Sequence, residues 1–543
     1  MNHDTRHGSA RYSDSHDIHA AGLTEPGGIH FGFDGNKSLS LDSQGPILTL
    51  AGSRSGKLAT VLAFNLIMPR TMRGHPLRAL VYDPKGGELA AISYWSQIDL
   101  NRPAYAINSH GVAGVPSQNL NPLDILKPGS PTLMGDCQAV FMDLLPPSSD
   151  KDGYFKEVMR GWAEQISYWH VNQFGGINLP QLYDIANVLK ANSDRSDELL
   201  AAMMDTGDAD TVAVAEEMDF KRRQTPKEYS PTISTLVNAL SSLKDPARRA
   251  TFEGKPDFSL SILTDPLQSP IIYYCDQEDY AERAAPISRL IFSVAKLYKA
   301  RAPESPPMYV LVDEANILKT FPTLLQLHSF GPGINARIQS VYQDTGQTDR
   351  HFSPAGTRSL IASSQLRQLF GVRDYDTAKL VSDMAGYQTV DADDALRREA
   401  ARYEKRKRFM AALQSDTPMM ELMDARYQDF AEQHRQKERK LLIEPDEVMN
   451  MPSDKQICFV SDLELDTLYV DRWQYWTRRE TAGRYYPNPY QPNPDRVMIK
   501  TRFGNRPAAV TTERVPDHLA HWPQHKNGYW KRIEGFPYRG HST

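Results

Sequence analysis

Cysteines are few in this chain, and long apolar runs and an excess of basic residues are missing. Only Cys137, Cys275 and Cys458 occur among 543 residues, and their wide spacing excludes a Cys-x-x-Cys metal site. The apolar stretch at residues 61–68 contains an asparagine and is far too short to span a membrane. The formal net charge of −5 excludes a protein that coats nucleic acid by overall positive charge, so a DNA contact requires local basic patches.

The first residues also lack the features of a targeting segment. Residues 1–23 are polar, without the basic start and apolar run of a signal peptide, and we expect them to form a flexible leader. The low cysteine content suits a reducing compartment and predicts a cytoplasmic location. Hydrophobic residues make up 40% of the chain and charged residues 24%, which is enough apolar sequence for a large core.

A glycine-rich turn between a strand and a helix is the first candidate site. Residues 47–50 (Ile-Leu-Thr-Leu) have the composition of a buried strand, and residues 58–68 have helical spacing. The turn between them suits a loop whose backbone N–H groups surround phosphate while a lysine neutralises its charge. The expected nucleotide-binding residues are Ala51, Gly52, Ser53, Arg54, Ser55, Gly56, Lys57 and Leu58.

The turn departs from the Gly-x-x-x-x-Gly-Lys-Ser/Thr pattern at both ends. Ala51 stands where the first glycine is expected, and Leu58 where a hydroxyl that binds Mg²⁺ is expected. Thr60 is two residues further on and would point elsewhere on a helix. A chance Gly/Ser-rich turn and a site with weak or absent hydrolysis therefore both stay open.

Two acids after an apolar strand form the second motif. Residues 308–312 (Met-Tyr-Val-Leu-Val) run directly into Asp313 and Glu314. Asp313 suits a role in holding Mg²⁺ through water, and Glu314 suits a general base that orients the attacking water. A strand that ends in two solvated acids is the alternative. The acids and the glycine turn can meet only if their strands are neighbours, which a parallel sheet permits.

Strand and helix signals alternate on both sides of a long helical stretch. This alternation predicts an α/β fold with a mainly parallel sheet, and residues 150–249 read as an inserted all-α block. The expected parts are the leader at 1–23, a nucleotide-binding domain at 24–149 and 256–480, an all-α domain at 150–255, and a Pro- and aromatic-rich tail at 481–543. Prolines and asparagines in this tail predict extended, polyproline-like segments.

Basic residues gather at a few places. Residues 221–223 and 248–249 lie in the helical block, and residues 397–408 hold seven basic side chains. Such patches suit contact with a phosphate backbone, but they equally suit solvated helix faces with ion pairs between adjacent turns.

Seven short blocks stand in a fixed order along the chain, at residues 51–57, 81–88, 121–124, 311–315, 340–344, 370–378 and 440–448. In these blocks and their order the chain resembles the TraG/TraD-type coupling proteins of type IV secretion and conjugation, which are FtsK/HerA-like P-loop ATPases. Loops in that family also begin with alanine, whereas Leu58 is bulkier than the residue usual there.

The resemblance implies a RecA-like P-loop domain with an inserted all-α domain that uses ATP and Mg²⁺, with Asp313 at the metal. It implies that Gln343 senses the γ-phosphate and that an arginine from a neighbouring subunit acts at the site, for which Arg367 is preferred to Arg373. Lys57, Asp313, Glu314, Gln343 and Arg367 are then the expected catalytic residues.

Two functions follow from the resemblance. The first is an ATPase, a hexamer when active and a monomer when isolated, that moves single-stranded DNA with its relaxase, or effector proteins, into a secretion channel. The second is a substrate receptor or scaffold of the secretion complex with little or no hydrolysis, which Leu58 favours. Because residues 61–68 cannot span a membrane, we expect a soluble member without the family's membrane anchor, attached to the inner membrane through channel components.

Overall fold

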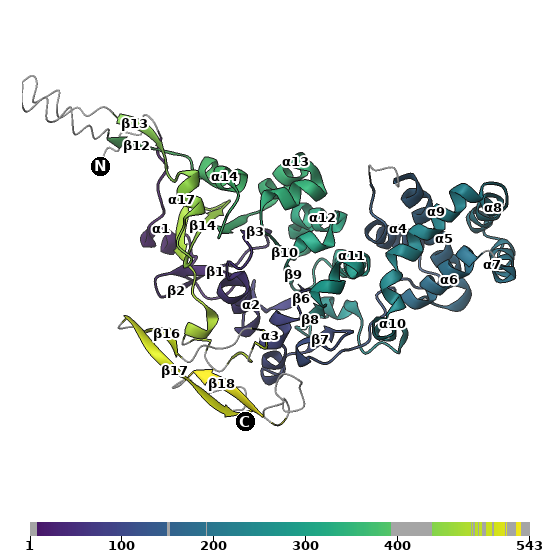
Figure 1. Cartoon of the computed structure of the whole chain (residues 1–543), viewed down its shortest axis with the longest axis horizontal. Helices are drawn as coiled ribbons and strands as arrows, with labels where there is room; N and C mark the ends of the chain where they lie inside the picture. Colours follow the sequence, from purple (N-terminus) through teal and green to yellow (C-terminus); the bar gives the residue numbers. More distant parts are fainter. Residues whose placement is uncertain are drawn as a thin grey trace, which may run out of the picture.

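The computed structural model describes residues 8–148, 153–191, 193–391 and 437–478, and shorter stretches from 480 to 533. Its centre is one eleven-stranded sheet (Figure 1). The strands run in the spatial order β2 (Lys37–Leu41), β1 (Ile29–Asp34), β15 (Leu468–Asp471), β14 (Lys455–Val460), β11 (Leu366–Phe370), β3 (Ile47–Ala51), β10 (Ala336–Tyr342), β9 (Met308–Val312), β6 (Arg78–Asp83), β8 (Ile271–Cys275) and β7 (Ala104–Ile107).

The sheet is mixed, with a parallel part that carries the predicted motifs. All neighbouring pairs from β11 to β7 are parallel, whereas β14, β15, β1 and β2 continue the sheet in antiparallel pairs. Strands of the parallel part are apolar on both faces because helices cover both sides. In β3, Leu48 and Leu50 face one core while Ile47 and Ala51 face the other.

Helices divide between these two cores. One face is covered by α1 (Ser15–Ala20), α2 (Ala63–Ile67) and α3 (Glu88–Asp99). The opposite face is covered by α4 (Leu133–Leu144), α11 (Glu278–Arg301), α12 (Pro322–Phe330), α13 (Thr345–Ser363), α14 (Tyr375–Ala385) and α17 (Pro445–Met449). The α/β fold with a mainly parallel sheet that the sequence predicts is therefore confirmed.

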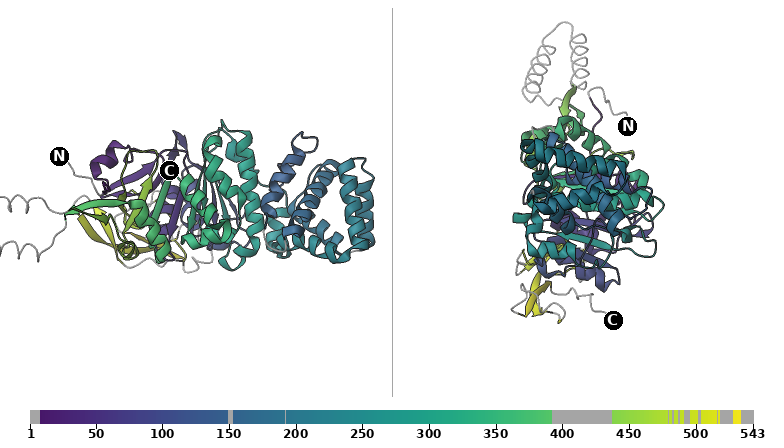
Figure 2. Two further views of the ribbon diagram at one scale, coloured as in Figure 1. Left: turned by 90° about the horizontal axis from the view of Figure 1, so that it is seen from above. Right: turned by 90° about the vertical axis from the view of Figure 1, so that its right-hand side faces the viewer.

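The helical block lies at one end of the molecule, beside α4 and α11 (Figures 1 and 2). It is continuous with the core on that face of the sheet, since Trp162, Ile166 and Leu236 belong to the same cluster of buried side chains as Leu48. Its helices are α5 (Gly153–Phe174), α6 (Leu179–Ala191), α7 (Asp194–Met204), α8 (Ala209–Gln224), α9 (Pro226–Ala239) and α10 (Pro246–Glu253).

The chain before β1 differs from the flexible leader expected for residues 1–23, wherever it is described. Asp14 caps α1 by accepting from two backbone N–H groups, and Ile18 and Leu23 are buried in the core. Tyr12 forms a bridge to Thr467 next to β15. A few apolar side chains within a polar segment are enough to hold it against the sheet.

The later part of the tail differs from the extended, polyproline-like segments expected. Three antiparallel strands form a separate small sheet, which lies below the main sheet in Figure 1. These are β16 (Arg496–Thr501), β17 (Gly504–Arg514) and β18 (Tyr529–Ile533). The β-branched residues at every second position of Arg-Val-Met-Ile-Lys-Thr at 496–501 are typical of a strand, a signal that the prolines before it obscured.

Short elements complete the described fold. They are the strand pairs β4 (Thr71–Met72) with β5 (His75–Pro76) and β12 (Tyr387–Asp391) with β13 (Lys437–Leu441), and the 3₁₀ turn η5 (Ala315–Leu318). The basic segment at 397–408 lies outside the described residues. Among the helices that are described, none is both long and apolar enough to cross a membrane.

Candidate nucleotide site

Four loops that follow neighbouring parallel strands meet at one edge of the sheet. The strands lie side by side in the order β3, β10, β9 and β6. Their carboxyl ends carry, respectively, the glycine turn, Gln343, the two acids and Lys85. Since parallel strands end at the same edge, these groups can contact each other. The sequence interpretation required the strands of the glycine turn and of the acids to be direct neighbours, and this was wrong, because β10 lies between β3 and β9. The loops after β3 and β9 still meet at this edge, since Lys57 reaches across β10 to the acids.

Lys57 reaches both acids. Its Nζ lies 2.9 Å from Oδ1 of Asp313 and 2.6 Å from Oε2 of Glu314. The three side chains are 12%, 2% and 6% exposed, respectively, so these ion pairs are screened little by solvent. A lysine from the first motif and two acids from the second thus form one cluster, although Lys57 and Glu314 are 257 residues apart.

Glu314 is the centre of this cluster. Lys85 Nζ lies 2.7 Å from Oε2, and Gln343 Nε2 donates to Oε1 over 2.6 Å. The backbone of Glu314 has a φ of +61°, which costs a residue with a side chain on the order of 1 kcal/mol or more. Such strain is retained where surrounding contacts over-determine a conformation, as three donors do for this carboxylate.

The electrostatics keep Glu314 ionised. Burial alone would raise the pKa of its carboxyl, but the ammonium groups of Lys57 and Lys85 outweigh burial and lower the pKa to about 2. Burial alone would lower the pKa of Lys57, yet Asp313 and Glu314 raise it above its usual value. At neutral pH the carboxylate of Glu314 is therefore available as an acceptor of protons or hydrogen bonds.

The pKa of Asp83, at the end of β6, is shifted in the opposite direction to that of Glu314. Burial is the largest cause that raises the pKa of its carboxyl to about 8, and the charges of Asp313 and Glu88 add to it. Its Oδ2 accepts from the N–H of Ala90 over 2.9 Å, at the start of α3. Lys85, two residues after Asp83, instead directs its ammonium group to the carboxylate of Glu314.

The glycine turn has the backbone that a phosphate loop requires. A Cβ on Gly52 would lie 2.0 Å from the carbonyl oxygen of Gly371, so only glycine fits this approach. Gly56 has a φ of +81°, which glycine adopts without strain. The hydroxyl oxygen of Ser55 is buried and has no hydrogen-bond partner within the described part of the chain. A polar atom of the turn is thus left for a bound anionic group.

Arg472 forms hydrogen bonds with the glycine turn and the residues after it, and the sequence analysis did not identify this residue. It follows β15, and its Nη1 donates to the carbonyl oxygen of Ser55 over 3.1 Å and to Oγ1 of Thr60 over 3.0 Å. Its guanidinium also lies 3.8 Å from the ring centre of Phe370. Because Ser55 and Arg472 are 417 residues apart, no local pattern could have shown the contact. Lys85, in contrast, stands in the block at residues 81–88 that the sequence analysis singled out.

Leu58 cannot supply a metal-binding hydroxyl, and its side chain lies in the core. It is 6% exposed and begins the π-helical turn Leu58–Leu62. The nearby hydroxyl of Thr60 donates to the carbonyl of Gly56 over 2.9 Å and accepts from Arg472. Asp313 therefore remains the residue in the cluster best suited to hold Mg²⁺.

Arg367 is not brought to this cluster within its own chain. It lies near the start of β11, opposite Leu48 of β3, and its Nη2 donates to Oγ of Ser461 over 2.5 Å. Arg373, the other arginine weighed from the sequence, lies in the loop after β11, where a Cβ on Gly52 would be 3.9 Å from its Cγ. Arg373 is exposed beside the turn, whereas Arg367 lies toward the opposite edge of the sheet.

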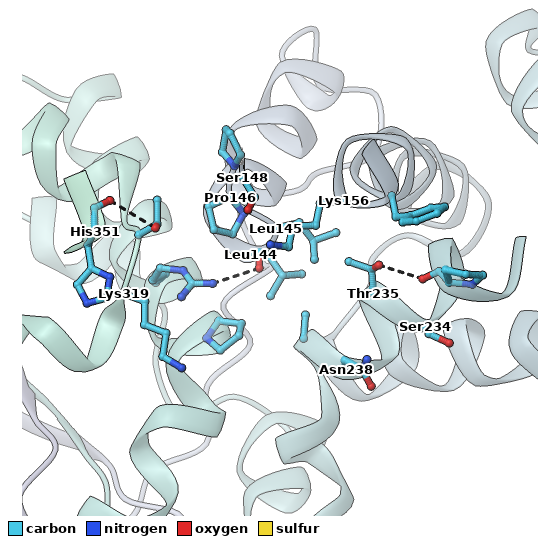
Figure 3. A pocket seen from close by; sticks show the side chains of 17 residues that line it. Leu144, Leu145, Pro146, Ser148, Lys156, Ser234, Thr235, Asn238, Lys319 and His351 are labelled. Atoms are coloured by element: carbon cyan, nitrogen blue, oxygen red, sulfur yellow. Dashed lines mark hydrogen bonds between the residues drawn. The ribbon is translucent and has the colours of Figure 1, made fainter. Parts of the chain in front are cut away.

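A cavity of about 630 Å³ lies elsewhere, between the helical block and the main sheet. Figure 3 shows Lys319 and His351 on one side of it and Thr235 and Asn238 on the other. Arg289 of α11 lines the cavity and donates to the carbonyl oxygens of Asp143, Leu144 and Leu318 over 2.7, 3.4 and 2.9 Å. It joins the end of α4 to η5, the turn that follows Glu314.

Fold and cluster together define a P-loop nucleotide-binding protein with a helical region attached to its sheet. The family model for Type IV secretory system Conjugative DNA transfer matches residues 16–499. The chain belongs to this family and is a type IV secretion conjugative DNA transfer coupling protein. No match was found among curated proteins.

Solved structures show the same fold. The plasmid coupling protein TrwB in complex with ADP and Mg²⁺ has a TM-score of 0.59 and 14% identity, over 86% of this chain and 94% of that chain. TrwB in complex with the non-hydrolysable ATP analogue ADPNP has a TM-score of 0.58 and 14% identity, over 86% and 93%. The trigonal form of TrwBdeltaN70 in complex with sulphate has a TM-score of 0.55 and 15% identity, over 85% and 93%.

Proposed function

We propose that this coupling protein hydrolyses ATP and uses the energy to move a transfer substrate into a secretion channel. The observation that carries the proposal is the convergence of Lys57, Asp313, Glu314 and Gln343 at one edge of the sheet. The substrate we propose is single-stranded DNA with its attached relaxase, or an effector protein. Binding of ADP and Mg²⁺ by TrwB supports ATP and Mg²⁺ as the cofactors here.

The residues present fit a nucleotide and its metal. The glycine turn and Lys57 would hold the phosphates, and Asp313 would hold Mg²⁺ through water, without help from Leu58. Bound ATP would supply the phosphoryl group, and Mg²⁺ would neutralise part of the negative charge on the phosphate oxygens. Glu314, ionised at neutral pH, would accept the proton of the attacking water, and the amide of Gln343 fixes the orientation of that carboxylate.

The assembly and location follow from the same proposal. We propose a homo-hexamer when active, in which Arg367 reaches the site of a neighbouring copy, and a monomer when isolated. Its partners would be channel components at the inner membrane, with the protein on the cytoplasmic side. The location of Arg367 away from its own cluster is compatible with action on another copy, and the exposed Arg373 would instead act within its own chain.

One observation favours a second function, a substrate receptor or scaffold with little hydrolysis. Leu58 places a buried methyl-bearing side chain where a metal-binding hydroxyl is usual. In that case nucleotide would bind through the turn and Lys57, but turnover would be slow. The other cluster residues are those of an active site, so hydrolysis is the function we prefer.

Nucleotide turnover with and without single-stranded DNA separates the two functions. We expect Mg²⁺-dependent release of phosphate that Lys57→Ala abolishes. The exposed Lys319, which pairs with Glu282 on the surface, provides the control variant Lys319→Ala. Equal release by the wild type and Lys57→Ala would exclude the motor. Tight nucleotide binding without release would support the receptor.

A further inference from the structure

The tail runs along α3 and ends on the loop that carries Lys85. Its described residues 484–486 and 488–490 are here called the tail strap. Ser96 donates to the carbonyl of Arg484, and the N–H of Tyr486 donates to the carbonyl of Ile92 over 2.9 Å. Further along, Asn488 lies 3.5 Å from a carboxylate oxygen of Glu88. The contacts on α3 move back by one helical turn for every two residues of the strap.

This register is what an extended chain requires. Four residues of helix rise by about 6 Å, and two residues of extended chain advance by about 6–7 Å. The tail strap therefore matches the repeat of α3 at Arg484, Tyr486 and Asn488, before the turn at residues 489–490. Tyr486 is 1% exposed, which anchors the strap in the middle. The strap is a fitted part of the fold, and β16 follows it in the chain.

The strap ends with a hydrogen bond to the Lys85 loop. The hydroxyl of Tyr490 donates to the carbonyl oxygen of Gly86 over 2.7 Å. On its other side, Gly86 donates its N–H to the carbonyl oxygen of Asp276 over 2.9 Å, and the Asp276 carboxylate pairs with Arg248 of α10 over 2.9 Å. The peptide groups that follow Lys85 are thus held between the tail and the helical block.

The loop needs such support because its backbone is unusual. Gly86 and Gly87 both have a φ near +70°, at +72° and +71°. Two consecutive glycines leave an unsupported loop many alternative conformations next to Lys85. A Cβ on Gly86 would also lie 2.7 Å from the Tyr490 hydroxyl, so the ring lies directly against this residue.

We propose that Tyr490 is a positioning residue of the nucleotide site, which holds the Gly86 loop so that Lys85 stays on Glu314. The tail strap thereby links the small tail sheet to the acid that activates water. A partner that displaces the strap would release Lys85 and change the rate of hydrolysis. This inference rests on the proposed ATPase function for its kinetic consequences, but the contact itself is independent of turnover.

The test uses the full chain and four variants: Tyr490→Phe, Lys85→Met, the double variant, and Tyr529→Phe. Phenylalanine keeps the ring and removes only the hydroxyl, so folding should be preserved. The control residue, Tyr529, is an exposed tyrosine of the same tail in β18. We expect Tyr490→Phe to lower kcat about fivefold, as loss of one hydrogen bond would, with KM little changed.

The double variant separates positioning from a merely structural role. If Tyr490 acts by keeping Lys85 on Glu314, Tyr490→Phe should have no further effect on kcat in the Lys85→Met background. Multiplied effects in the double variant would overturn the proposal.

A third measurement does not depend on hydrolysis. Amide hydrogen exchange at residues 85–88 of the nucleotide-free chain should be faster in Tyr490→Phe and unchanged in Tyr529→Phe. Unchanged exchange in Tyr490→Phe would overturn the role of the strap. If the wild type showed no turnover while exchange responded as expected, the ATPase proposal would fail and the positioning contact would stand.

Discussion

Lys57 and Lys85 donate to the same carboxylate oxygen of Glu314, at 2.6 Å and 2.7 Å. They come from the loops after β3 and β6, two strands that are separated in the sheet by β10 and β9. With Asp313 also paired to Lys57, two positive and two negative charges balance inside a largely buried cluster. A change in any one of the four leaves an uncompensated charge, and this makes the cluster sensitive to pH and to substitution.

The first prediction concerns stability in acid. Since the pKa of Glu314 is about 2 in the folded chain and about 4.3 in an unfolded one, its contribution to stability is complete above the unfolded value. It is lost as pH falls through the range between these values. The advantage of the wild type over Glu314→Gln in the midpoint of thermal unfolding should therefore shrink between about pH 5 and pH 2.

Glu282→Gln is the control for that measurement. Glu282 is 69% exposed and lies 3.5 Å from Lys319, so its removal should change stability little at any pH. A constant difference between the wild type and Glu314→Gln across the whole range would show that the carboxyl is not held ionised by the lysines.

The second prediction concerns Asp83, whose contribution to stability changes with pH in the opposite direction. The pKa of Asp83 is raised to about 8, so the folded chain binds a proton there that the unfolded chain has already released. Stability from this residue falls as pH rises from the unfolded value of about 4 toward 8. Asp83→Asn should abolish this loss, because asparagine is neutral and its oxygen can still accept from Ala90. Thermal unfolding at about pH 5 and pH 9 measures the difference. A wild type that loses no more stability than the variant at the higher pH would contradict the prediction.

Whether a contact could be predicted from the sequence depends on how many residues separate its two partners. The strands before Lys57 and Asp313 each carry a local apolar signal, so a parallel sheet that carries both loops was predictable. The strand before Gln343 contains Arg337, Gln339 and Ser340, and its position between β3 and β9 was not predictable from the sequence. Arg472 touches the glycine turn from the far end of the chain, and an isolated arginine after a strand carries no signal of that contact. The tail sheet was not predicted, because the prolines that precede it indicated extended segments for the whole tail.

The third prediction concerns Leu58. Leu58→Thr should restore a hydroxyl next to Lys57 and increase Mg²⁺-dependent turnover. It should also destabilise the fold by about 1–3 kcal/mol, because a buried leucine loses apolar contacts and gains a polar atom. Leu58→Val removes similar volume without adding a hydroxyl and separates the two effects. A titration of turnover with Mg²⁺ measures the first effect, and chemical denaturation measures the second. Equal turnover in the two variants would show that the hydroxyl has no role.

The fourth prediction concerns the support of the glycine turn. Arg472→Lys keeps the positive charge but cannot donate to both Ser55 and Thr60 while lying flat on Phe370. We expect nucleotide affinity to fall about tenfold, which corresponds to the loss of one charged hydrogen bond. Binding of a fluorescent ATP analogue measures this.

A matched control exists for this variant. Arg478 also stacks on an aromatic ring, with its guanidinium 4.5 Å from the centre of Phe33, and it donates to the carbonyl of Asn36. Arg478→Lys should leave nucleotide affinity nearly unchanged, since these contacts do not include the turn. A similar loss of affinity in both variants would indicate a general loosening of the sheet.

The last prediction concerns the junction between the acid loop and the helical block. Arg289 is deeply buried, and burial lowers its pKa to about 10 despite the nearby Asp143. Its guanidinium donates hydrogen bonds to carbonyl groups at the end of α4 and to that of Leu318, the last residue of η5, which directly follows Glu314.

Arg289→Met keeps the length of the side chain but leaves these carbonyls unpaired, at a cost of about 1–3 kcal/mol for each buried group. The free energy of unfolding should fall accordingly, whereas Arg283→Met, an exposed position on the same helix, should have little effect. Because the junction also anchors η5, Arg289→Met should accelerate amide exchange in residues 314–318, and equal exchange in both variants would show that the arginine does not hold the acid loop.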